Sequence, residues 1–438
     1  MNGQPDLVKE AKEVLDQNYT GSYTVPAPHL YPHQWLWDSC FVAIGLRHID
    51  IERAKTEILS LLEGQWHNGM LPNMIFAENS PDKNVWNSSL SPHAPDYIHT
   101  SGITQPPMLA EAIVKIGQKL KKAERRLWYK QTFPALLAYH EWLYKDRDPH
   151  NEGLILLVHP WETGLDNTPP WMHAMHEHQL ATWIRAVKIL HLGPIINLFR
   201  KDTQRIPSAQ RIDIIDALGL FSTQRRLRRK SYDITRILRH SLFSIEDVTF
   251  NAIFVRANQN LTDIATFLGQ DLGEELTEKI AKTTTALEQL WDAYSGQYYS
   301  RDFVTHGFLK QSTIGTLMPL YAGTISEDRA KQLVRLLENQ HSFGSAYPVP
   351  SVPISSPHFK PEGYWQGPTW VNTNWLIIDG LKRAGFKDHA RVLQESTIEL
   401  IERSGFYEYF NPLTGDPAGA ANFSWTAALA VDLILSKD

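Results

Sequence analysis

Apolar residues recur at intervals of three and four along most of this 438-residue chain. This spacing places them on one face of an α-helix, so it predicts a series of helices joined alternately by short polar turns and long loops. The predicted helices are Leu7–Leu15, Ile51–Leu62, Met108–Leu120, Arg125–Leu143, His176–Leu192, Val248–Leu268, Leu276–Tyr294, Glu327–Leu337, Val371–Ala384, Ala390–Glu402 and Ser424–Leu435. Strand signals are sparse, and we interpret Leu154–Val158 and Tyr298–Phe303 as short hairpin arms.

This pattern predicts an all-α fold built from helical hairpins. Two concentric rings of helices would bury the apolar faces in an (α/α)6 barrel, with the long loops forming a pocket at one end. Because no linker rich in Pro, Gly and Ser divides the chain, we expect residues 1–438 to form a single domain. We expect a basic insertion, lid-like or on the surface, at about residues 200–245, since seven Lys and Arg residues lie between Arg225 and Arg239.

Composition narrows the class of protein. A hydrophobic fraction of 42% and a charged fraction of 21% are typical of a folded globular chain. A net charge of −5 gives no electrostatic footprint for nucleic acid or an acidic membrane, so we expect neither as a partner. With one cysteine, Cys40, no apolar signal region and no apolar run of 18 residues, we expect a cytoplasmic protein. The sequence is compatible with a homo-oligomer.

Aromatic residues are unusually frequent, with 14 Trp, 16 Tyr and 17 Phe. Many of the Trp lie in turn-like segments beside Asp, Glu, Gln and Asn, which favours a binding cleft in which flat rings cover the C–H face of a sugar. Two such segments contain a carboxylate: Asp166 in 159–169 and Glu408 in 405–415. Glycoside hydrolysis needs such a pair, one acid to protonate the leaving oxygen and one base to activate water.

The two carboxylates have different expected environments. An apolar wall such as Trp161 raises the pKa of a nearby carboxyl group by desolvation, which suits Asp166 to the role of acid. Glu408, between two tyrosines, needs room for one water and contacts that keep it ionised. Glu162 and Glu362 remain alternatives that spacing alone does not exclude.

Other segments add polar and aromatic candidates. Asp38 follows Trp35 and Trp37, and it is either a helix N-cap or an acceptor of hydrogen bonds from two sugar hydroxyls. Gln105 precedes two prolines, which hold it extended and suit a fixed side chain in a pocket. The 18 His show no His-Glu-x-x-His spacing, so we expect no metal and no other cofactor.

Two aromatic segments near the C-terminus each lead into a predicted helix. Residues 362–370 form a Gly-flanked loop that fits a lid closing over a sugar. Residues 422–426 predict a helix start with Ser424 as the cap and Trp425 facing either the core or a ligand.

Five segments, taken in order, resemble glycoside hydrolase family 63, in particular its bacterial mannosylglycerate and glucosylglycerate hydrolases. They are QWLWD at 34–38, WETGLDN at 161–167, YWQGP at 364–368, EYF at 408–410 and FSWTAA at 423–428, and the resemblance extends from about Tyr31 to about Leu433. It implies an (α/α)6 barrel and inverting hydrolysis, with Asp166 as general acid and Glu408 as general base. The substrate-binding residues that it implies are Tyr31, Trp35, Trp37, Asp38, Gln105, Trp161, Gly164, Trp370 and Trp425, with Tyr364, Trp365 and Gln366 in a lid over the aglycone.

One segment departs from the family pattern. The glycerate-cleaving branch has an Arg-Pro pair with a Tyr six residues after the Arg, and together they grip the carboxylate of glycerate. This chain keeps Arg211, a further substrate-binding candidate, but Ile212 replaces the Pro and Ala217 stands at the position of the Tyr. The basic stretch Arg225–Arg239 is an alternative source of that contact.

Our first hypothesis is an inverting α-glycosidase that hydrolyses a small α-glycoside, with mannosylglycerate or glucosylglycerate as the leading substrates. An alternative is an α-glucosidase acting on a neutral disaccharide or glucosylglycerol. From other classes, a sugar epimerase on the same toroid would need a His pair, and a non-catalytic sugar-binding protein would not need two intact carboxylates. Inversion predicts a separation of roughly 6.5–9.5 Å between the carboxyl groups of Asp166 and Glu408.

Overall fold

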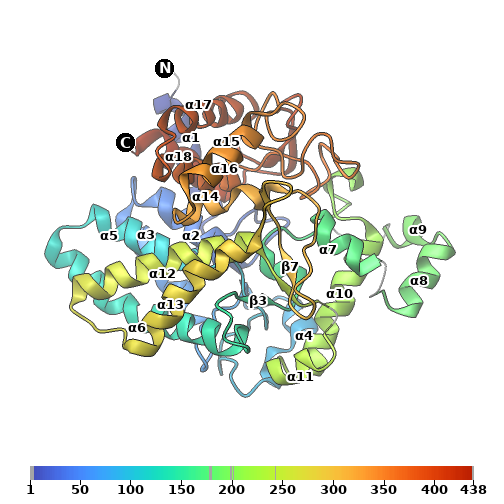
Figure 1. Ribbon diagram of the computed structural model, residues 1–438, viewed down its shortest axis with the longest axis horizontal. Coiled ribbons are helices and arrows are strands. Elements are labelled where there is room, and N and C mark those ends of the chain that lie inside the picture. Colours follow the sequence, from blue (N-terminus) through green and yellow to red (C-terminus); the bar gives the residue numbers. More distant parts are fainter. Residues whose placement is uncertain (1–3, 177–179, 198–199, 201, 242, 437–438) are drawn as a thin grey trace.

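The computed structural model describes residues 4–176, 180–197, 200, 202–241 and 243–436, and these are mostly helical (Figure 1). The longer helices are α1 (Gln4–Gln17), α2 (Leu36–Leu46), α3 (Ile51–Glu63), α5 (Leu109–Lys119), α6 (Lys122–Arg147), α10 (Ile214–Arg229), α12 (Val248–Leu268), α13 (Glu274–Ala286), α15 (Glu327–Glu338), α16 (Val371–Arg383), α17 (Lys387–Ser404) and α18 (Ser424–Leu435). The shorter helices are α4 (Asp82–Trp86), α7 (Pro169–Ala174), α8 (Thr182–Ile189), α9 (Gly193–Asn197), α11 (Ile234–Leu238) and α14 (Pro319–Ala322). Among the described helices, none is long and apolar enough to cross a membrane.

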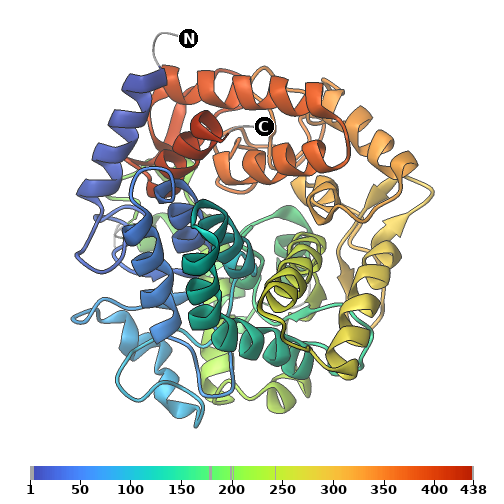
Figure 2. The same cartoon turned by 90° about the vertical axis from the view of Figure 1, so that its left-hand side faces the viewer.

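Helices from distant parts of the chain close into a ring. α2 packs on α5, α5 on α12, α12 on α14, α14 on α16 and α16 on α18, and α18 returns to α2. A second set packs against this ring, with α3 on α2, α6 on α5 and α12, α13 on α12, α17 on α16 and α1 on α18. In Figure 2 the first helix, dark blue, therefore lies beside the last helices, in red.

The ring helices are apolar enough to form the centre of the core. Every residue of α2 is buried, and a helix that is hydrophobic on all sides belongs inside a protein. Its Gly45 allows α2 to lie directly on α18, because a Cβ atom there would come within 2.2 Å of the backbone oxygen of Ala428. The tight contact between these two helices closes the ring where the chain ends meet.

Several ring helices begin at the same end of the molecule. Asp38 lies in the first turn of α2, Trp370 directly precedes α16, and Trp425 lies in the first turn of α18. The indole ring of Trp425 lies 5.5 Å from the ring of Trp37 and 5.7 Å from that of Trp370, measured between centroids. Motif residues that are far apart in sequence thus meet where these helices start.

Short antiparallel strands hold the loops at this end. They are paired as β1 (Gln34–Trp35) with β2 (Met74–Ile75), β4 (Ile245–Glu246) with both β3 (Leu156–Leu157) and β7 (Arg301–Asp302), β5 (Trp291–Asp292) with β6 (Gln297–Tyr298), and β8 (Tyr407–Phe410) with β9 (Pro417–Ala421). The predicted arm Leu154–Val158 contains β3. The predicted arm Tyr298–Phe303 was wrong as a single strand, because Tyr298 belongs to β6 and the next strand, β7, joins a different sheet.

Two predicted helices were too long. The helix predicted at Leu276–Tyr294 ends at Ala286, since the chain tightens into a 3-10 turn and then forms β5. The helix predicted at His176–Leu192 is not continuous, because Ala181 is extended and α8 begins only at Thr182. Residues 177–179 of that prediction lie outside the described residues.

The predicted cap Ser424 was wrong, and the N-cap alternative for Asp38 is excluded. α2 begins at Leu36, so Asp38 lies inside its first turn and not at the N-cap. α18 begins at Ser424 and its N-cap residue is Phe423. The hydroxyl of Ser424 donates to the carbonyl of Val25 at 2.7 Å, which ties the start of α18 to the segment before α2.

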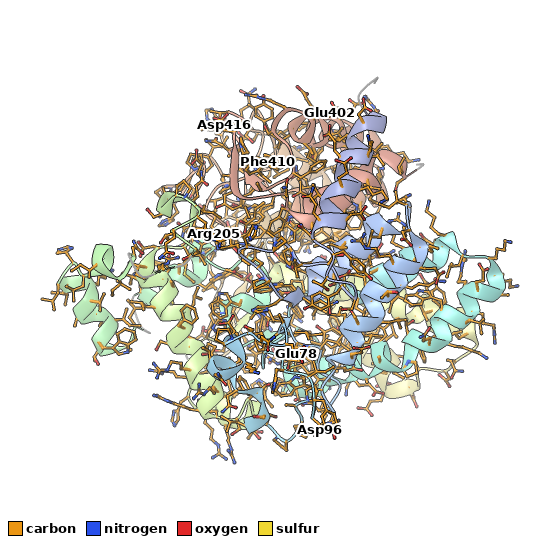
Figure 3. The ribbon with its side chains drawn as sticks, turned by 180° about the vertical axis from the view of Figure 1, so that it is seen from behind. Glu78, Asp96, Arg205, Glu402, Phe410 and Asp416 are labelled. Atoms are coloured by element: carbon orange, nitrogen blue, oxygen red, sulfur yellow. The ribbon has the colours of Figure 1, made fainter. Side chains whose placement is uncertain are left out.

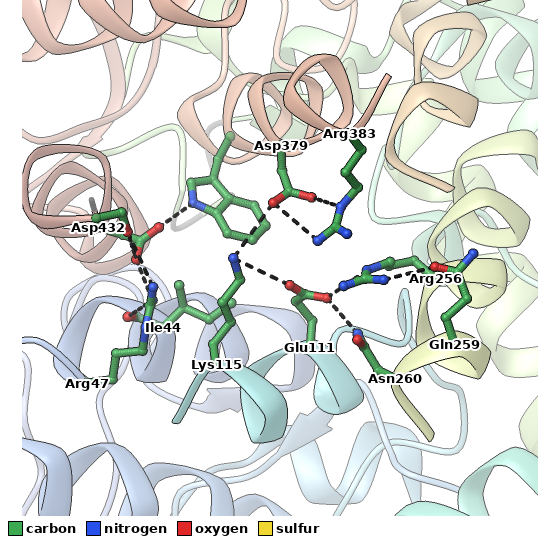
Figure 4. A network of polar contacts seen from close by, with 12 residues as sticks. Ile44, Arg47, Glu111, Lys115, Arg256, Gln259, Asn260, Asp379, Arg383 and Asp432 are labelled. Carbon is green, nitrogen blue, oxygen red and sulfur yellow. Dashed lines mark hydrogen bonds and ion pairs between the residues drawn. The ribbon is translucent and has the colours of Figure 1, made fainter. Parts of the chain in front are cut away.

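A buried charge network joins the opposite ends of the ring helices (Figure 4). Asp432 of α18 forms an ion pair with Arg47, and it lies 2.8 Å from both the imidazole Nε2 of His48 and the indole nitrogen of Trp375. Burial raises the pKa of Asp432, but the hydrogen bond with His48 and the charge of Arg47 outweigh it and hold this pKa well below its usual range. The network keeps an ionised carboxylate between α2, α16 and α18.

We expect Asp432→Asn to lower the free energy of unfolding by about 3–5 kcal/mol at pH 7, because it leaves Arg47 buried without its counter-charge. Since the folded pKa is depressed, this stabilisation is present above the unfolded pKa of about 3.9 and is lost as pH falls through the folded pKa. Urea denaturation at pH 7 measures the first effect, and a series from about pH 4 down to about pH 2 follows the progressive loss. Asp388→Asn, at a side chain that is 95% exposed, is the control, and equal denaturation midpoints for the two variants would contradict the expectation.

Candidate active site

Loops at the end where α2, α16 and α18 begin enclose a cavity of about 270 Å³. Asp166 and Glu408 both line it, although they are far apart in sequence. The other predicted site residues on its wall are Tyr31, Trp35, Trp37, Asp38, Gln105, Trp161, Gly164, Arg211, Tyr364, Trp365 and Trp425. The fold therefore gathers both carboxylates and most of the predicted aromatic residues around one space.

Glu408 lies on the β8–β9 hairpin and is held by three donors. The hydroxyl of Tyr31 donates to its Oε1 at 2.7 Å, and the backbone N–H of Ala420 donates to its Oε2 at 2.9 Å. A guanidinium nitrogen of Arg211 lies 3.4 Å from the same Oε2. With 1% of its surface exposed, this carboxylate has a fixed position on the cavity wall.

Asp166 has fewer partners. Among the described side chains, the hydroxyl of Tyr364 donates to its Oδ2 at 3.4 Å. Burial raises the pKa of Asp166 to about 7, against the opposing charge of Arg211, and the nearby charge of Glu408 adds to the rise. This agrees in direction with the rise predicted from apolar surroundings, and the carboxyl group is partly protonated near neutral pH and protonated below it.

The pKa of Asp38 is raised as well. Burial raises its pKa well above the usual range, and the negative charges of Glu408 and Asp166 act in the same direction. With the N-cap excluded, the remaining prediction for Asp38 is a charged acceptor for sugar hydroxyls. The raised pKa favours the neutral form of this carboxyl group, which can donate one hydrogen bond and accept others.

The two rival carboxylates do not line the cavity. Glu162 forms a bidentate ion pair with Arg147, with N–O distances of 2.7 and 3.0 Å, and is fully buried. Glu362 accepts hydrogen bonds from Gln210 at 3.1 Å and from Asn411 at 3.3 Å. These contacts explain Glu162 and Glu362 as residues that hold the fold together, outside the cavity.

Two predicted substrate-binding residues lie behind the wall. The side-chain amide of Gln366 donates to the carbonyl of Asn167 at 2.9 Å, which ties the predicted lid to the Asp166 loop. Trp370 stacks on Trp365, with 3.8 Å between ring centroids, and its indole N–H donates to the carbonyl of Tyr364 at 3.1 Å. Both residues support the lid from outside the cavity.

Sequence reasoning missed part of the wall. The missed wall residues are Pro26, Arg200, Asp202, Ile212, Ala217, Leu220, Phe221 and Phe423. Ile212, Ala217 and Phe423 lay in segments that the family pattern had drawn attention to. Arg200 and Asp202 gave no signal, because neither lies in an aromatic segment or in a segment of the family pattern. Figure 3 shows this loop, near Arg205, below the hairpin that carries Phe410.

Arg211 lies on the cavity wall between two tyrosines. Its guanidinium carbon lies 5.6 Å from the ring centroid of Tyr31 and 4.9 Å from that of Tyr364. No residue of the basic stretch Arg225–Arg239 lines this cavity. Arg228, which belongs to that stretch, donates to backbone carbonyls of α4. Arg211 is therefore better placed than the basic stretch to meet an acidic group in the cavity.

Gly419 shapes the hairpin around Glu408. Its φ of +74° is left-handed, and a Cβ atom there would come within 2.6 Å of a Glu408 carboxylate oxygen. We expect Gly419→Ala to lower kcat/KM at least about tenfold, because displacing a reacting group by about 1 Å can cost 100-fold. Gly269→Ala is the matched control, with a φ of +71° and nothing within 4 Å of the added Cβ. Equal activity of the two variants in steady-state assays would contradict a special role for this glycine.

A cavity walled by Trp and Tyr, which holds Asp166 with a raised pKa and Glu408 fixed by three donors, has the equipment of a glycoside hydrolase. The family model of the mannosylglycerate hydrolase MGH1-like glycoside hydrolase domain matches residues 31–426. The chain therefore belongs to this family of glycoside hydrolases, and the predicted resemblance to glycoside hydrolase family 63 is confirmed.

Known proteins of this family are similar to the chain over nearly its whole length. It is 40% identical to the mannosylglycerate hydrolase of Thermus thermophilus, covering 96% of this chain and 99% of that protein. It is 32% identical to the glucosylglycerate hydrolase of Mycolicibacterium hassiacum, covering 97% of each. A crystal structure of the GH63 mannosylglycerate hydrolase from Thermus thermophilus, in complex with Tris and D-glycerate, superposes with a TM-score of 0.87 at 38% identity, covering 97% of this chain and 99% of that one.

Proposed function

We propose that this protein is an inverting α-glycosidase that hydrolyses mannosylglycerate or glucosylglycerate, with Asp166 as general acid and Glu408 as general base. The main support is the contrast between the two carboxyl groups on one cavity wall. Asp166 has a pKa of about 7 and, among the described side chains, Tyr364 alone as a hydrogen-bonding partner, whereas Glu408 is fixed by Tyr31, Ala420 and Arg211. The relatives that act on mannosylglycerate and glucosylglycerate supply the substrate class.

The reaction needs a proton transfer on each side of the sugar: one proton is given to the leaving oxygen, and one is taken from water. The carboxyl of Asp166 gives its proton to the glycosidic oxygen as the bond from the anomeric carbon to that oxygen breaks. Glu408 takes a proton from a water molecule, and the water oxygen bonds to the anomeric carbon from the opposite face. The products are the sugar with inverted configuration and the free aglycone, and this geometry requires roughly 6.5–9.5 Å between the two carboxyl groups.

Unpaired donors on the wall support a sugar ligand. The indole N–H groups of Trp35 and Trp425 are buried and have no hydrogen-bond partner among the described residues. Buried polar groups are nearly always paired, and both of these Trp line the cavity. Hydroxyl oxygens of a bound sugar would satisfy both donors, while the aromatic faces would cover its C–H surfaces.

We also propose that the ring of helices is the inner ring of an (α/α)6 barrel that forms a single domain. In this proposal α2, α5, α12, α14, α16 and α18 are the inner helices, and α1, α3, α6, α13, α15 and α17 are the outer ones. The closed sequence of helix contacts and the continuous hydrophobic core from Leu7 to Leu433 support it. Residues 200–245 would then be an insertion beside the pocket.

Proton NMR of the first-formed sugar tests the proposal. Mannosylglycerate, glucosylglycerate, glucosylglycerol and a neutral α-linked disaccharide form the substrate panel. We expect glycerate glycosides to be cleaved and the β-anomer to appear before mutarotation. An α-anomer as first product would contradict inversion, and no turnover of any substrate would favour a non-catalytic sugar-binding protein.

A neutral aglycone is the second candidate, and one observation favours it. Ala217 lines the cavity at the position where the glycerate-cleaving branch has a Tyr. The tyrosine hydroxyl that binds the glycerate carboxylate together with the Arg in that branch is therefore missing at this position. Preferential cleavage of glucosylglycerol in the same panel would support this candidate.

A further inference from the structure

Two charged residues that the sequence analysis did not select lie beside Arg211 on the cavity wall. Asp202 accepts hydrogen bonds from Arg200 at 3.1 Å to Oδ1 and at 2.7 Å to Oδ2. The same Oδ2 lies 3.5 Å from Nε of Arg211. Asp202 therefore lies between two guanidinium groups, and all three residues line the cavity with Glu408.

Arg211 thus has two resident carboxylate neighbours. Its Nη1 lies 3.4 Å from Glu408, and its Nε lies 3.5 Å from Asp202. Burial raises the pKa of Asp202, but the hydrogen bonds and charges of Arg200 and of Arg211 outweigh it, so Asp202 is ionised at neutral pH. On the described wall, the charges of Arg200 and Arg211 are balanced by those of Asp202 and Glu408.

This balance matters for an acidic aglycone. A ligand carboxylate that enters a closed cavity needs a positive charge that is not already neutralised. Because Asp202 is bound more closely to Arg200 than to Arg211, it can give up its contact with Arg211 and keep its own counter-ion. A second negative charge at Arg211 would still be repelled by Asp202.

We propose that Asp202 is a specificity-determining residue of the aglycone subsite. It competes with the carboxylate of an acidic aglycone for Arg211 and so lowers the preference of the enzyme for acidic over neutral polyol aglycones. This inference rests on the proposed function, because it assumes that the aglycone lies against Arg211.

The test compares wild type with Asp202→Asn, which keeps the size and removes the charge. The first readout is the ratio of kcat/KM on glucosylglycerate to kcat/KM on glucosylglycerol, which we expect to rise at least about tenfold, since like-charge contacts cost several kcal/mol. The second readout is calorimetric binding of D-glycerate relative to glycerol, which needs no turnover and should shift in the same direction.

Asp213→Asn is the matched control. Asp213 is an exposed N-cap of α10 that accepts from the backbone N–H of Ile215, and it does not line the cavity. Asn caps a helix as well as Asp does, so this variant removes one charge nearby without changing the wall. We expect its substrate ratio to stay within about twofold of wild type, well inside the tenfold effect of a like-charge contact.

The outcomes separate this inference from the proposed function. If wild type cleaves the glycosides and Asp202→Asn leaves both ratios unchanged or lowers them, the inference is overturned and the proposed function stands. If wild type cleaves neither glycoside, the proposed function fails, and the relative affinity for D-glycerate still decides the role of Asp202. If the Asn variant has a lowered melting temperature, Asp202→Ser repeats both measurements with a smaller neutral side chain.

Discussion

Asp166→Asn and Glu408→Gln are each expected to lower kcat at least about 100-fold while leaving the protein folded, since general acid–base catalysis contributes about 10²–10⁴. The first variant removes the proton donor, and the second removes the group that deprotonates water. Steady-state kinetics on glucosylglycerate and mannosylglycerate, with circular dichroism for folding, measure the effect. Glu362→Gln is the control, because Glu362 bonds to Gln210 and Asn411 outside the cavity. If this control abolished turnover and Glu408→Gln did not, the base would be misassigned.

The pH dependence follows from the raised pKa of Asp166, about 7. The acid must be protonated to act, so kcat/KM should fall about tenfold per pH unit above about pH 7. Because the folded pKa lies above the unfolded value of about 3.9, the stabilisation by the bound proton is complete below that value. It is lost as pH rises through about 7. Asp166→Asn should therefore melt at a higher temperature than wild type at pH 8, and this advantage should vanish at pH 4. An unchanged difference between these pH values would contradict the raised pKa.

Arg211→Ala is expected to lower kcat/KM on a glycerate glycoside about 30-fold or more beyond its effect on a neutral aryl glycoside, because an unpaired carboxylate in a buried site costs at least about 2 kcal/mol. Both substrates should lose some activity, since Arg211 also contacts Glu408. The ratio of the two kcat/KM values is therefore the measurement.

Arg228→Ala is the control for Arg211→Ala, because Arg228 belongs to the basic stretch and does not line the cavity. A wild-type preference for glucosylglycerol, together with an unchanged substrate ratio in Arg211→Ala, would exclude the acidic aglycone. It would leave the assignment to the glycoside hydrolases intact.

Sequence periodicity predicted most of the long helices because a helix that packs on a ring must carry one apolar face. The periodicity gave a wrong prediction where the chain forms a short strand or turn although its apolar residues have helical spacing. The segment after Ala286 is apolar at helical spacing, but it turns into β5 because Trp291 pairs with Tyr298. The hairpin around Glu408 escaped prediction, since its strand β8 is only four residues long and pairs across a turn rich in Pro and Gly.

By itself the sequence determined the chemical groups, the helical class and the family, because these depend on residue types and spacing along the chain. Only the tertiary structure decided which carboxylates face the cavity. Glu162 and Asp166 lie four residues apart in one aromatic segment, yet Arg147 neutralises the first and the second is left with a raised pKa. Asp202 had no local signal, and it joins the wall only because its loop brings it beside Arg211. The role of a carboxyl group depends on partners brought by the fold, and the sequence pattern around it does not encode them.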